Sequence, residues 1–150
     1  MDYIDKRLIN LLQKDCKQTT KQLSIQLNLS VTAIYERIKK LEKEGVIKNY
    51  VALINRNKID KSFLVFCHVK LIQHSREYVT IFEKEIMKLH EVSECFHVSG
   101  DYDYILKIYV KDMDEYRNFM VSKLTTIKYI GSTHSIFNIY GVKNSNVIPF

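Results

Sequence analysis

The sequence predicts an α+β protein in which an N-terminal three-helix, winged-type helix-turn-helix precedes a C-terminal ferredoxin-like βαββαβ unit. Apolar residues recur at helical spacing as far as Leu41 and alternate along strand-like runs from Phe63 onward. The charge is also divided, because residues 1–61 hold 13 Lys and Arg against 7 Asp and Glu, whereas residues 62–150 hold 10 of each. All of the net charge of +6 therefore lies in the first part, which indicates an anion-binding module joined to a neutral one.

The first 45 residues predict three short amphipathic helices, whose apolar residues stand three or four positions apart. Their apolar faces consist of Ile4, Leu8, Leu11 and Leu12 in the first helix, Leu23 and Leu27 in the second, and Val31, Ile34, Ile38 and Leu41 in the third. We place the second helix at about 19–27 and the third at about 31–44, with errors of a few residues at each end.

Residues suited to helix ends stand at these boundaries. Thr19 or Thr20 is a good N-cap for the second helix, and Ser30 is one for the third. Asn28 tolerates the left-handed conformation that follows many helices, and Gly45 ends the third helix. Two short helices, a tight turn and a third helix make a helix-turn-helix, with an ordinary amphipathic surface helix as the alternative interpretation.

A β-prone run, Val46–Ile54, follows the third helix and predicts a connecting strand. A polar stretch then leads to the second half of the chain. We therefore expect a helix-turn-helix domain at residues 1–47, a connecting strand or linker at 48–61, and a second domain with a short C-terminal tail at 62–150.

The second half predicts elements in the order β-α-β-β-α-β. The expected strands are Phe63–Ile72, Val92–Ser99, Tyr104–Val110 and about Gly131–Val142, and the expected helices carry Tyr78, Phe82, Ile86 and Leu89, and then Phe119 and Leu124. Asp112 and Glu115 form an Asp-x-x-Glu capping box at the second of these helices. A tight loop, Gly100–Asp103, joins the two middle strands.

Both faces of the predicted sheet are apolar, although its two helices can cover only one of them. The first strand carries Phe63, Val65, Cys67, Val69 and Leu71 on one face and Leu64, Phe66, His68, Lys70 and Ile72 on the other. We therefore expect self-association, at least to a homodimer. Two recognition helices on a two-fold axis then suit a palindromic duplex with half-sites roughly 34 Å apart.

The composition excludes several classes of protein. No apolar run approaches the roughly 18–20 residues of a membrane span, so we expect no membrane partner. The N-terminus has no apolar signal-peptide core. Three cysteines without Cys-x-x-Cys spacing favour a reduced, cytoplasmic location without a disulfide framework.

Little in the sequence favours catalysis or a metal. The histidines show no close ligand spacing to a cysteine or carboxylate, and Cys95 lies in an apolar strand where a thiol packs as a small hydrophobe. Gly-x-Ser-x-Gly and nucleotide-binding glycine motifs are absent. We expect no enzyme, no metal and no cofactor. A small-molecule enzyme on a ferredoxin-like dimer and a winged-helix adaptor for RNA or protein are the alternatives.

Two motifs together resemble a known family. The first is Thr20-Lys-Gln-Leu-Ser-Ile-Gln-Leu-Asn-Leu-Ser30 followed by Ile34-x-x-Arg37-Ile38-x-x-Leu41-Glu42-x-x-Gly45-Val46-Ile47, and the second is Val98-Ser-Gly-Asp-Tyr-Asp-Tyr-Ile-Leu106. They resemble the helix-turn-helix and the RAM domain of the Lrp/AsnC (feast/famine) transcriptional regulators, and of these the leucine-responsive branch most. The resemblance covers essentially the whole chain. Asn28 and Val31 stand where the family often has Gly and Pro, and neither change affects the expected fold.

The resemblance implies a sequence-specific DNA-binding regulator of transcription. The residues expected to contact DNA are Lys21, Ser30, Thr32, Ala33, Glu36, Arg37, Lys39, Lys40 and Lys43. Short or acidic side chains such as Thr32 and Glu36 suit base edges. The basic residues Lys21, Arg37 and Lys43 suit phosphates.

The resemblance also implies an amino-acid effector, bound between RAM domains, that alters assembly or DNA affinity, and dimers that assemble further, commonly to octamers. The matching residues are Gly100, Asp101, Tyr102 and Asp103, with Gly131, Thr133 and Ser135 as a second segment. Asp101 or Asp103 would pair with the ligand's ammonium group, and backbone N–H groups near Gly100 with its carboxylate. Leucine or another apolar amino acid is the expected effector.

Overall fold

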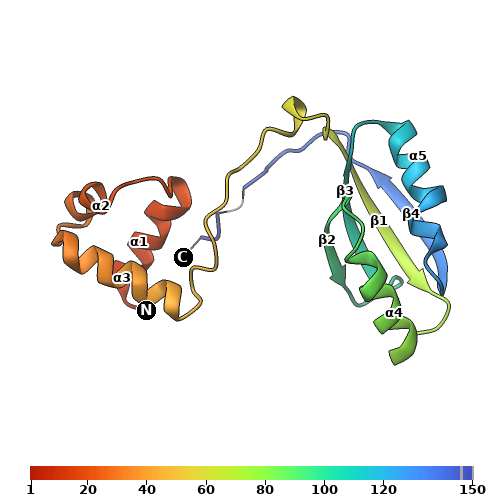
Figure 1. The fold of residues 1–150 in the computed structure, drawn as a ribbon, viewed down its shortest axis with the longest axis horizontal. Helices are drawn as coiled ribbons and strands as arrows, with labels where there is room; N and C mark the ends of the chain where they lie inside the picture. The colour runs from red at the N-terminus through yellow and green to blue at the C-terminus, as the bar shows by residue number, and fades with distance from the viewer. Residues whose placement is uncertain (146, 150) are drawn as a thin grey trace. The chain divides into compact units, whose positions relative to one another are not determined.

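A computed structural model describes residues 1–145 and 147–149. The chain forms two compact units, one of Met1–Leu53 with the tail from Val142, and one of Ile54–Gly141 (Figure 1). The side chain of Gln13 exchanges hydrogen bonds of 3.0 and 2.7 Å with the backbone of Ile148, which fastens the tail to the first unit. We had expected the tail to belong with the second domain. No helix among the described residues is long and apolar enough to cross a membrane.

The N-terminal unit contains the three predicted helices: α1 (Tyr3–Lys14), α2 (Thr20–Leu27) and α3 (Val31–Lys43). Asp2, Thr19 and Ser30 are their N-caps, and each side chain accepts a hydrogen bond from the backbone N–H three residues on. Asn28 takes a left-handed φ of 54° and thereby turns the chain from α2 toward α3. The local signals read from the sequence therefore operate as expected.

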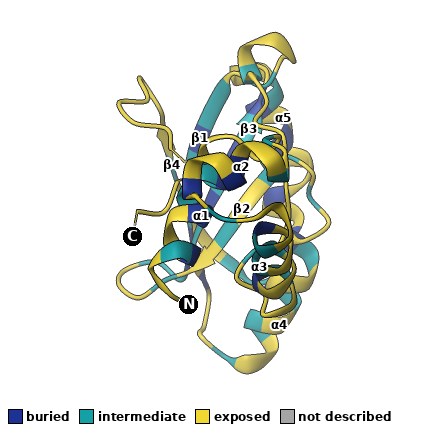
Figure 2. Cartoon of the chain, turned by 90° about the vertical axis from the view of Figure 1, so that its left-hand side faces the viewer, coloured by how far each residue is buried: buried dark blue, intermediate teal, exposed yellow. Residues whose placement is uncertain are grey.

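One apolar face of each helix contributes to the core of this unit. Leu8, Leu23 and Ile34 are fully buried, and Leu41 is nearly so. The outer surfaces of the helices are exposed, as the yellow colour in Figure 2 shows. Because these are the predicted apolar stripes, the polar side of α3 faces away from the core.

An ion pair between α1 and α3 adds a polar contact to this core. Arg37 Nη1 donates to Asp5 Oδ1 at 2.6 Å and to Asp2 Oδ2 at 2.7 Å. Asp5 is only 2% exposed, and a buried carboxylate is costly unless it is paired. Burial alone raises the pKa of Asp5, but the hydrogen bond from Asp2 N–H and the Arg37 guanidinium outweigh it and lower that pKa. The pair therefore fixes α3 against the N-terminal end of α1.

The connecting strand expected after α3 is not formed. Residues 48–55 belong to no helix or strand, and a 3-10 turn, Arg56–Lys58, is the next element. Val51, Leu53 and Ile54 are more than half exposed. The prediction of a strand from its β-prone side chains was therefore wrong, because a strand requires a partner backbone, and residues 48–54 have no backbone hydrogen bond to another segment of the described chain.

The second unit contains β1 (Phe63–Leu71), α4 (Arg76–Ile86), β2 (Val92–His97), β3 (Tyr104–Val110), α5 (Met113–Ser122) and β4 (Ile130–Phe137). This is the predicted βαββαβ order, and the strands form one antiparallel sheet in the order β2-β3-β1-β4. β4 ends at Phe137 rather than at Val142. Phe137 pairs with Val65 and Asn138 N–H donates to Leu64 O, so only the first two residues of β1 remain beyond this point, too few to continue β4 to Val142.

The start of α5 differs in detail from the expected capping box. Asp112 accepts from Glu115 N–H at 2.9 Å, as predicted. The Glu115 carboxylate, however, accepts from Lys111 N–H and from Lys61 Nζ instead of closing the box on Asp112. Lys61 gives Glu115 a charged hydrogen-bond donor, which is a stronger partner for a carboxylate than a backbone N–H alone.

The two helices cover one face of the sheet and leave the other uncovered in the described chain. Val65, Cys67 and Leu106 are fully buried beneath Phe82 of α4 and Phe119 of α5. The uncovered face carries Leu64, Phe66, Phe96, Ile105, Tyr109 and Ile136, which the strand register places together. Phe96 is 50% exposed and Ile136 is 42% exposed. Both faces of β1 therefore carry apolar side chains, as predicted, and the helices of the described chain cover only one of these faces.

We predict that Arg37→Ala lowers the free energy of unfolding of the N-terminal unit by about 1–3 kcal/mol, because it leaves the buried Asp5 carboxylate without its charged partner. Urea unfolding followed by circular dichroism measures this change, and Lys88→Ala, which removes an exposed pair on α4, is the control. The pKa of Asp5 is lowered by folding, so the pair stabilises above pH 3.8 and is lost as the pH falls below it. A loss that is equally large at pH 2 would contradict this role.

Candidate functional site

The predicted reading surface lies on the side of α3 away from the core. Thr32, Glu36, Lys39, Lys40 and Lys43 are exposed, as is Lys21 on α2, while Ala33 and Arg37 are partly buried. Ser30 Oγ accepts from Ala33 N–H at 3.1 Å and so sets where α3 begins. The structure therefore brings most of the predicted DNA-contacting residues onto one accessible helix surface.

Two lysines of this surface are paired with nearby glutamates. Lys39 Nζ lies 3.2 Å from Glu42 Oε2, and Lys40 Nζ lies 3.9 Å from Glu44 Oε1. Lys43 forms no ion pair with any residue that the structure describes. Exposed pairs of this kind contribute at most about 1 kcal/mol, so a phosphate can replace either glutamate at little expense.

Arg37 has a structural role that the sequence did not indicate. Its positive charge is shared with Asp2 and Asp5, at 2.7 and 2.6 Å, and this raises its pKa further. We expected it to bind phosphate, but a guanidinium already neutralised by two carboxylates gains less from a third anion. Lys21 and Lys43 are better placed for that task.

The loop between β2 and β3 has a second set of candidate residues. Gly100 turns it with a φ of +126°, which side chains rarely tolerate. Val98 N–H donates to Asp103 O, and Asp103 N–H donates to Val69 O, both at 2.9 Å. Within the described chain the N–H groups of residues 99–102 donate to no backbone or side-chain acceptor. The loop is thus closed at its base, and its tip presents free backbone donors.

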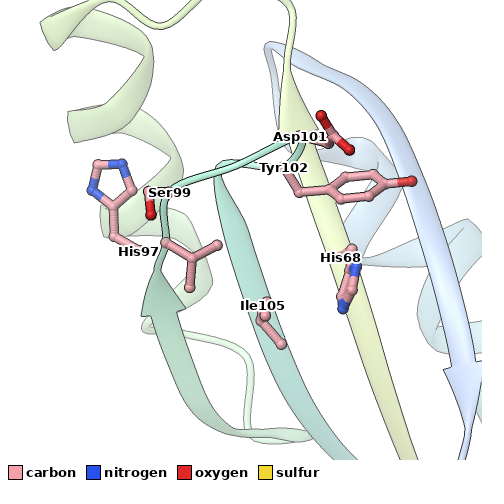
Figure 3. Close-up of a pocket in the computed structure, with 7 residues that line it drawn as sticks. His68, His97, Ser99, Asp101, Tyr102 and Ile105 are labelled. Carbon is pink, nitrogen blue, oxygen red and sulfur yellow. The ribbon is translucent and has the colours of Figure 1, made fainter.

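An open hollow of about 750 Å³ lies against this loop. It is lined by His68, His97, Val98, Ser99, Asp101, Tyr102 and Ile105. Figure 3 shows Tyr102 lying across the sheet near His68, with Asp101 at the turn and His97 on the other side of the loop. The rings of His68 and Tyr102 meet edge to face, with centroids 5.0 Å apart. The volume is in the range of small-molecule pockets, but one wall is missing.

The two acidic residues of the loop differ in their surroundings. Asp101 is exposed and has no hydrogen bond or ion pair with the part of the chain that the structure describes. Asp103 is fastened, because its Oδ2 accepts from Leu71 N–H at 2.7 Å and its Oδ1 lies 3.0 Å from His74 Nδ1. Only Asp101 is therefore free to bind a cationic group, a distinction that the sequence left open.

The second predicted segment, Gly131, Thr133 and Ser135, does not line this hollow. Ser135 pairs with Cys67 in the sheet and is hydrogen-bonded to Tyr116 of α5 at 2.6 Å, so it faces the helices. A Cβ on Gly131 would lie 3.2 Å from Ile72 N, which explains the glycine. Alternation along β4 separates these residues from the uncovered face, so within one chain they do not adjoin the loop, and their part in effector binding stays a prediction.

His68 lines the hollow but was not predicted to do so, and Val98, Ser99 and Ile105 were named only as part of the family motif. The register supplies the missing signal, since His68 pairs with Ile105 across β1 and β3. Two residues opposite each other on antiparallel strands point to the same face. This pairing depends on strand register, which a single sequence does not fix.

The described residues contain no group of three His, Cys, Asp or Glu side chains arranged to hold a metal ion. Burial raises the pKa of Cys67, and it raises that of Cys95 to about 11. Neither thiol is therefore ionised near neutral pH, and neither supports a nucleophilic role.

Known families match both units. Residues 64–148 match the Lrp/AsnC ligand binding domain, and residues 1–48 match a winged helix-turn-helix DNA-binding family. The chain belongs to the Lrp/AsnC family. It is a DNA-binding transcriptional regulator with a ligand-binding domain.

Relatives and solved structures agree with this assignment. The chain is 37% identical to the leucine-responsive regulatory protein of Escherichia coli over 97% of its own length and 89% of that protein's. An AsnC family transcriptional regulator from Agrobacterium tumefaciens has a TM-score of 0.94 at 31% identity, covering 99% of this chain and 97% of that one. A Neisseria meningitidis transcriptional regulator in complex with L-methionine has a TM-score of 0.95 at 25% identity, covering 99% and 96%.

We predict that Lys40→Ala weakens binding to duplexes of unrelated sequence by similar factors and lowers the slope of log K against log salt by about one, because one phosphate contact is lost. Fluorescence anisotropy across a salt series measures both. Lys88→Ala is the matched control, since Lys88 also forms an exposed pair with a nearby glutamate, Glu85 near the end of α4, but lies in the ligand-binding unit. A loss restricted to one base position would show that Lys40 reads sequence instead.

Proposed function

We propose that this Lrp/AsnC-family protein is a sequence-specific regulator of transcription whose assembly or DNA affinity changes when a free amino acid binds at the loop of residues 98–103. The observation that carries the proposal is the combination, on one loop, of a free carboxylate and free backbone N–H groups beside an open hollow. A free amino acid carries the two charges that complement them.

The arrangement of the loop supports a specific orientation for this ligand. Its ammonium group would meet Asp101, and its carboxylate would meet the N–H groups around Gly100. Its side chain would then lie along Val98 and Ile105, which are the apolar part of the lining. This favours leucine or another apolar amino acid. It is consistent with the name of the leucine-responsive relative and with the L-methionine complex of the Neisseria protein.

The reading surface of α3 supports a palindromic duplex as the DNA partner. Thr32 and Glu36 present short polar groups suited to base edges, whereas Lys21, Lys40 and Lys43 suit phosphates. Two such surfaces in a dimer would contact two half-sites and double the number of neutralised phosphates. A DNA partner also favours action in the cytoplasm.

The uncovered face of the sheet supports a homodimer or a larger assembly. Phe66 pairs with Ile136 on this face, Phe96 pairs with Ile105, and Leu64 pairs with Tyr109, so each of the four strands contributes at least one apolar side chain to it. Exposed apolar surfaces of this extent usually mark an interface. A second copy offers the same surface, which suits a two-fold contact, and further association of dimers to octamers extends the proposal.

Neither alternative function has a specific observation in its favour. An enzyme requires a reactive group with an activating partner, and an adaptor for RNA would be indicated by stacking aromatics on a basic sheet. We therefore propose no catalytic activity and no cofactor.

We predict that one or more apolar amino acids raise the thermal stability of the protein in a screen of all twenty, since a ligand at 100 times its Kd adds ~2.7 kcal/mol to the folded state. Asp101→Asn should weaken that binding about tenfold or more without changing the unliganded melting temperature, because the charged partner of the ammonium is lost. Asp60→Asn is the control, since Asp60 is an exposed acid with a φ of 52° that asparagine also tolerates. Unchanged affinity in Asp101→Asn would refute the proposed orientation.

We also predict that Phe66→Glu reduces the assembly, because a carboxylate replaces an apolar side chain at the centre of the uncovered face. Light scattering should show the wild type as a multiple of 17.8 kDa at micromolar concentration and the variant with a smaller mass. Val121→Glu, at an exposed apolar position on α5, is the control and should leave the mass unchanged. A monomeric wild type would refute the proposed interface outright.

A further inference from the structure

Histidines gather around the proposed effector loop to a degree that the proposed function does not explain. Four of the five histidines of the chain contact or flank it. His68 and His134 lie near Tyr102, on the uncovered face of the sheet, with the His68 and Tyr102 centroids 5.0 Å apart. The other two, His74 and His97, have ring centroids 5.3 Å apart and lie near Asp103. This second pair, unlike the first, is connected to Asp103.

Asp103 connects His74 and its neighbour His97 to the loop. Its backbone closes the base of the loop through Val98 and Val69, and its side chain joins Leu71 N–H to the imidazole of His74. Three of these four bonds use backbone groups, whose hydrogen-bonding capacity does not change between pH 5 and 8. The bond to His74 is the one that changes with protonation, because an imidazolium is a charged donor and a neutral imidazole donates from one nitrogen alone.

The charged surroundings of Asp103 are consistent with this pairing. Burial alone raises its pKa, but the Leu71 N–H, the His74 hydrogen bond and the positive charges of His74 and His97 outweigh it and lower that pKa. The remaining titratable groups facing this point are Tyr104 at the start of β3 and Glu83 of α4, and these are hydrogen-bonded to each other at 3.0 Å. Asp103 therefore stays ionised across the range in which imidazoles titrate.

We propose that His74 is a positioning residue for the effector loop: by pairing with Asp103 it holds the turn that carries Asp101 and Tyr102 in its ligand-binding geometry, and it does so more firmly when protonated. The inference rests on the proposed function only for the identity of the ligand. His74 itself does not line the hollow, although its ring lies beside that of His97, which does.

The sign of the effect follows from the charges. Protonated His74 and ionised Asp103 attract each other, so the loop is held more firmly when His74 carries its proton than when its imidazole is neutral. As the pH rises the attraction is lost, the loop opens more often, and binding of the amino acid weakens. The side chain of His74 is 59% exposed, so the effect is modest, and about two- to fivefold is expected for a pair of this exposure.

The test uses His74→Gln, which keeps a neutral hydrogen-bond donor, and His74→Ala, which removes it. His90→Gln is the matched control, because His90 is an exposed histidine of the same unit with no hydrogen bond or ion pair within the described residues. The first readout is hydrogen exchange of the three amides whose hydrogen bonds involve Asp103, those of Leu71, Val98 and Asp103, in the ligand-free, full-length protein, corrected for the intrinsic pH dependence of exchange.

In the wild type and in His90→Gln these amides should exchange about two- to fivefold more slowly at pH 5.5 than at pH 8. In His74→Gln the difference should vanish while protection stays near the wild-type value at pH 8. In His74→Ala the loop should exchange faster at every pH. The same pH difference in the wild type and His74→Gln would overturn the inference.

The second readout is calorimetric titration with L-leucine and with L-methionine at the two pH values. The affinity of whichever amino acid binds should fall about two- to fivefold between pH 5.5 and 8 in the wild type, and His74→Gln should abolish that change. If neither amino acid binds but the exchange of the loop depends on His74, the proposed effector fails and the hold of His74 on the loop stands. If binding occurs with the same pH profile in every variant, the effector stands and His74 is not its positioning residue.

Discussion

The period of two along a β-strand is the constraint on which most of this structure depends. Successive side chains point to opposite faces, so each strand of the sheet supplies residues both to the core under α4 and α5 and to the uncovered face. The helices can satisfy only one of these sets. The chain nevertheless keeps both sets apolar, and it places the β2–β3 loop at the edge of the uncovered set. Core, self-association surface and ligand loop are therefore three consequences of one alternation.

A different constraint applies to the DNA-binding unit, because its positively charged side chains must both stabilise the fold and remain available to bind DNA. Arg37 is used inside the unit, because Asp5 is buried and requires a cation. Lys39 and Lys40 of α3 pair only with glutamates at the surface, whose attraction water and salt largely screen, and Lys43 has no ion pair with a described residue. The unit thus keeps its strongest ion pair for the α1–α3 contact and leaves weak, replaceable pairs on the surface that would meet phosphate.

Local signals in the sequence were sufficient where the physics is local. Ser30 caps α3 and Asn28 turns the chain before it, because both effects involve only the next few backbone groups. Tyr104–Val110 was predicted to the residue because both its neighbours complete its ladder. The strand predicted after α3 is not formed, since a strand requires a partner backbone from a distant part of the chain. The sequence also did not reveal the roles of Arg37, Ser135 and His68. Each of these residues contacts a residue that is distant in the chain, and only the folded structure brings the two together.

The position of the loop determines how a ligand there can affect DNA binding. The loop and α3 belong to different units of the chain, so under the proposed function a ligand at Asp101 would change DNA affinity through an equilibrium that involves both sites. The hollow is open and lies at the edge of the proposed self-association face, so a second copy that covered its open side would couple ligand binding to assembly. The coupling is reciprocal: if the ligand strengthens association, association strengthens ligand binding by the same factor. Apparent affinity for the amino acid then depends on protein concentration, which it would not do if the site were complete within one chain.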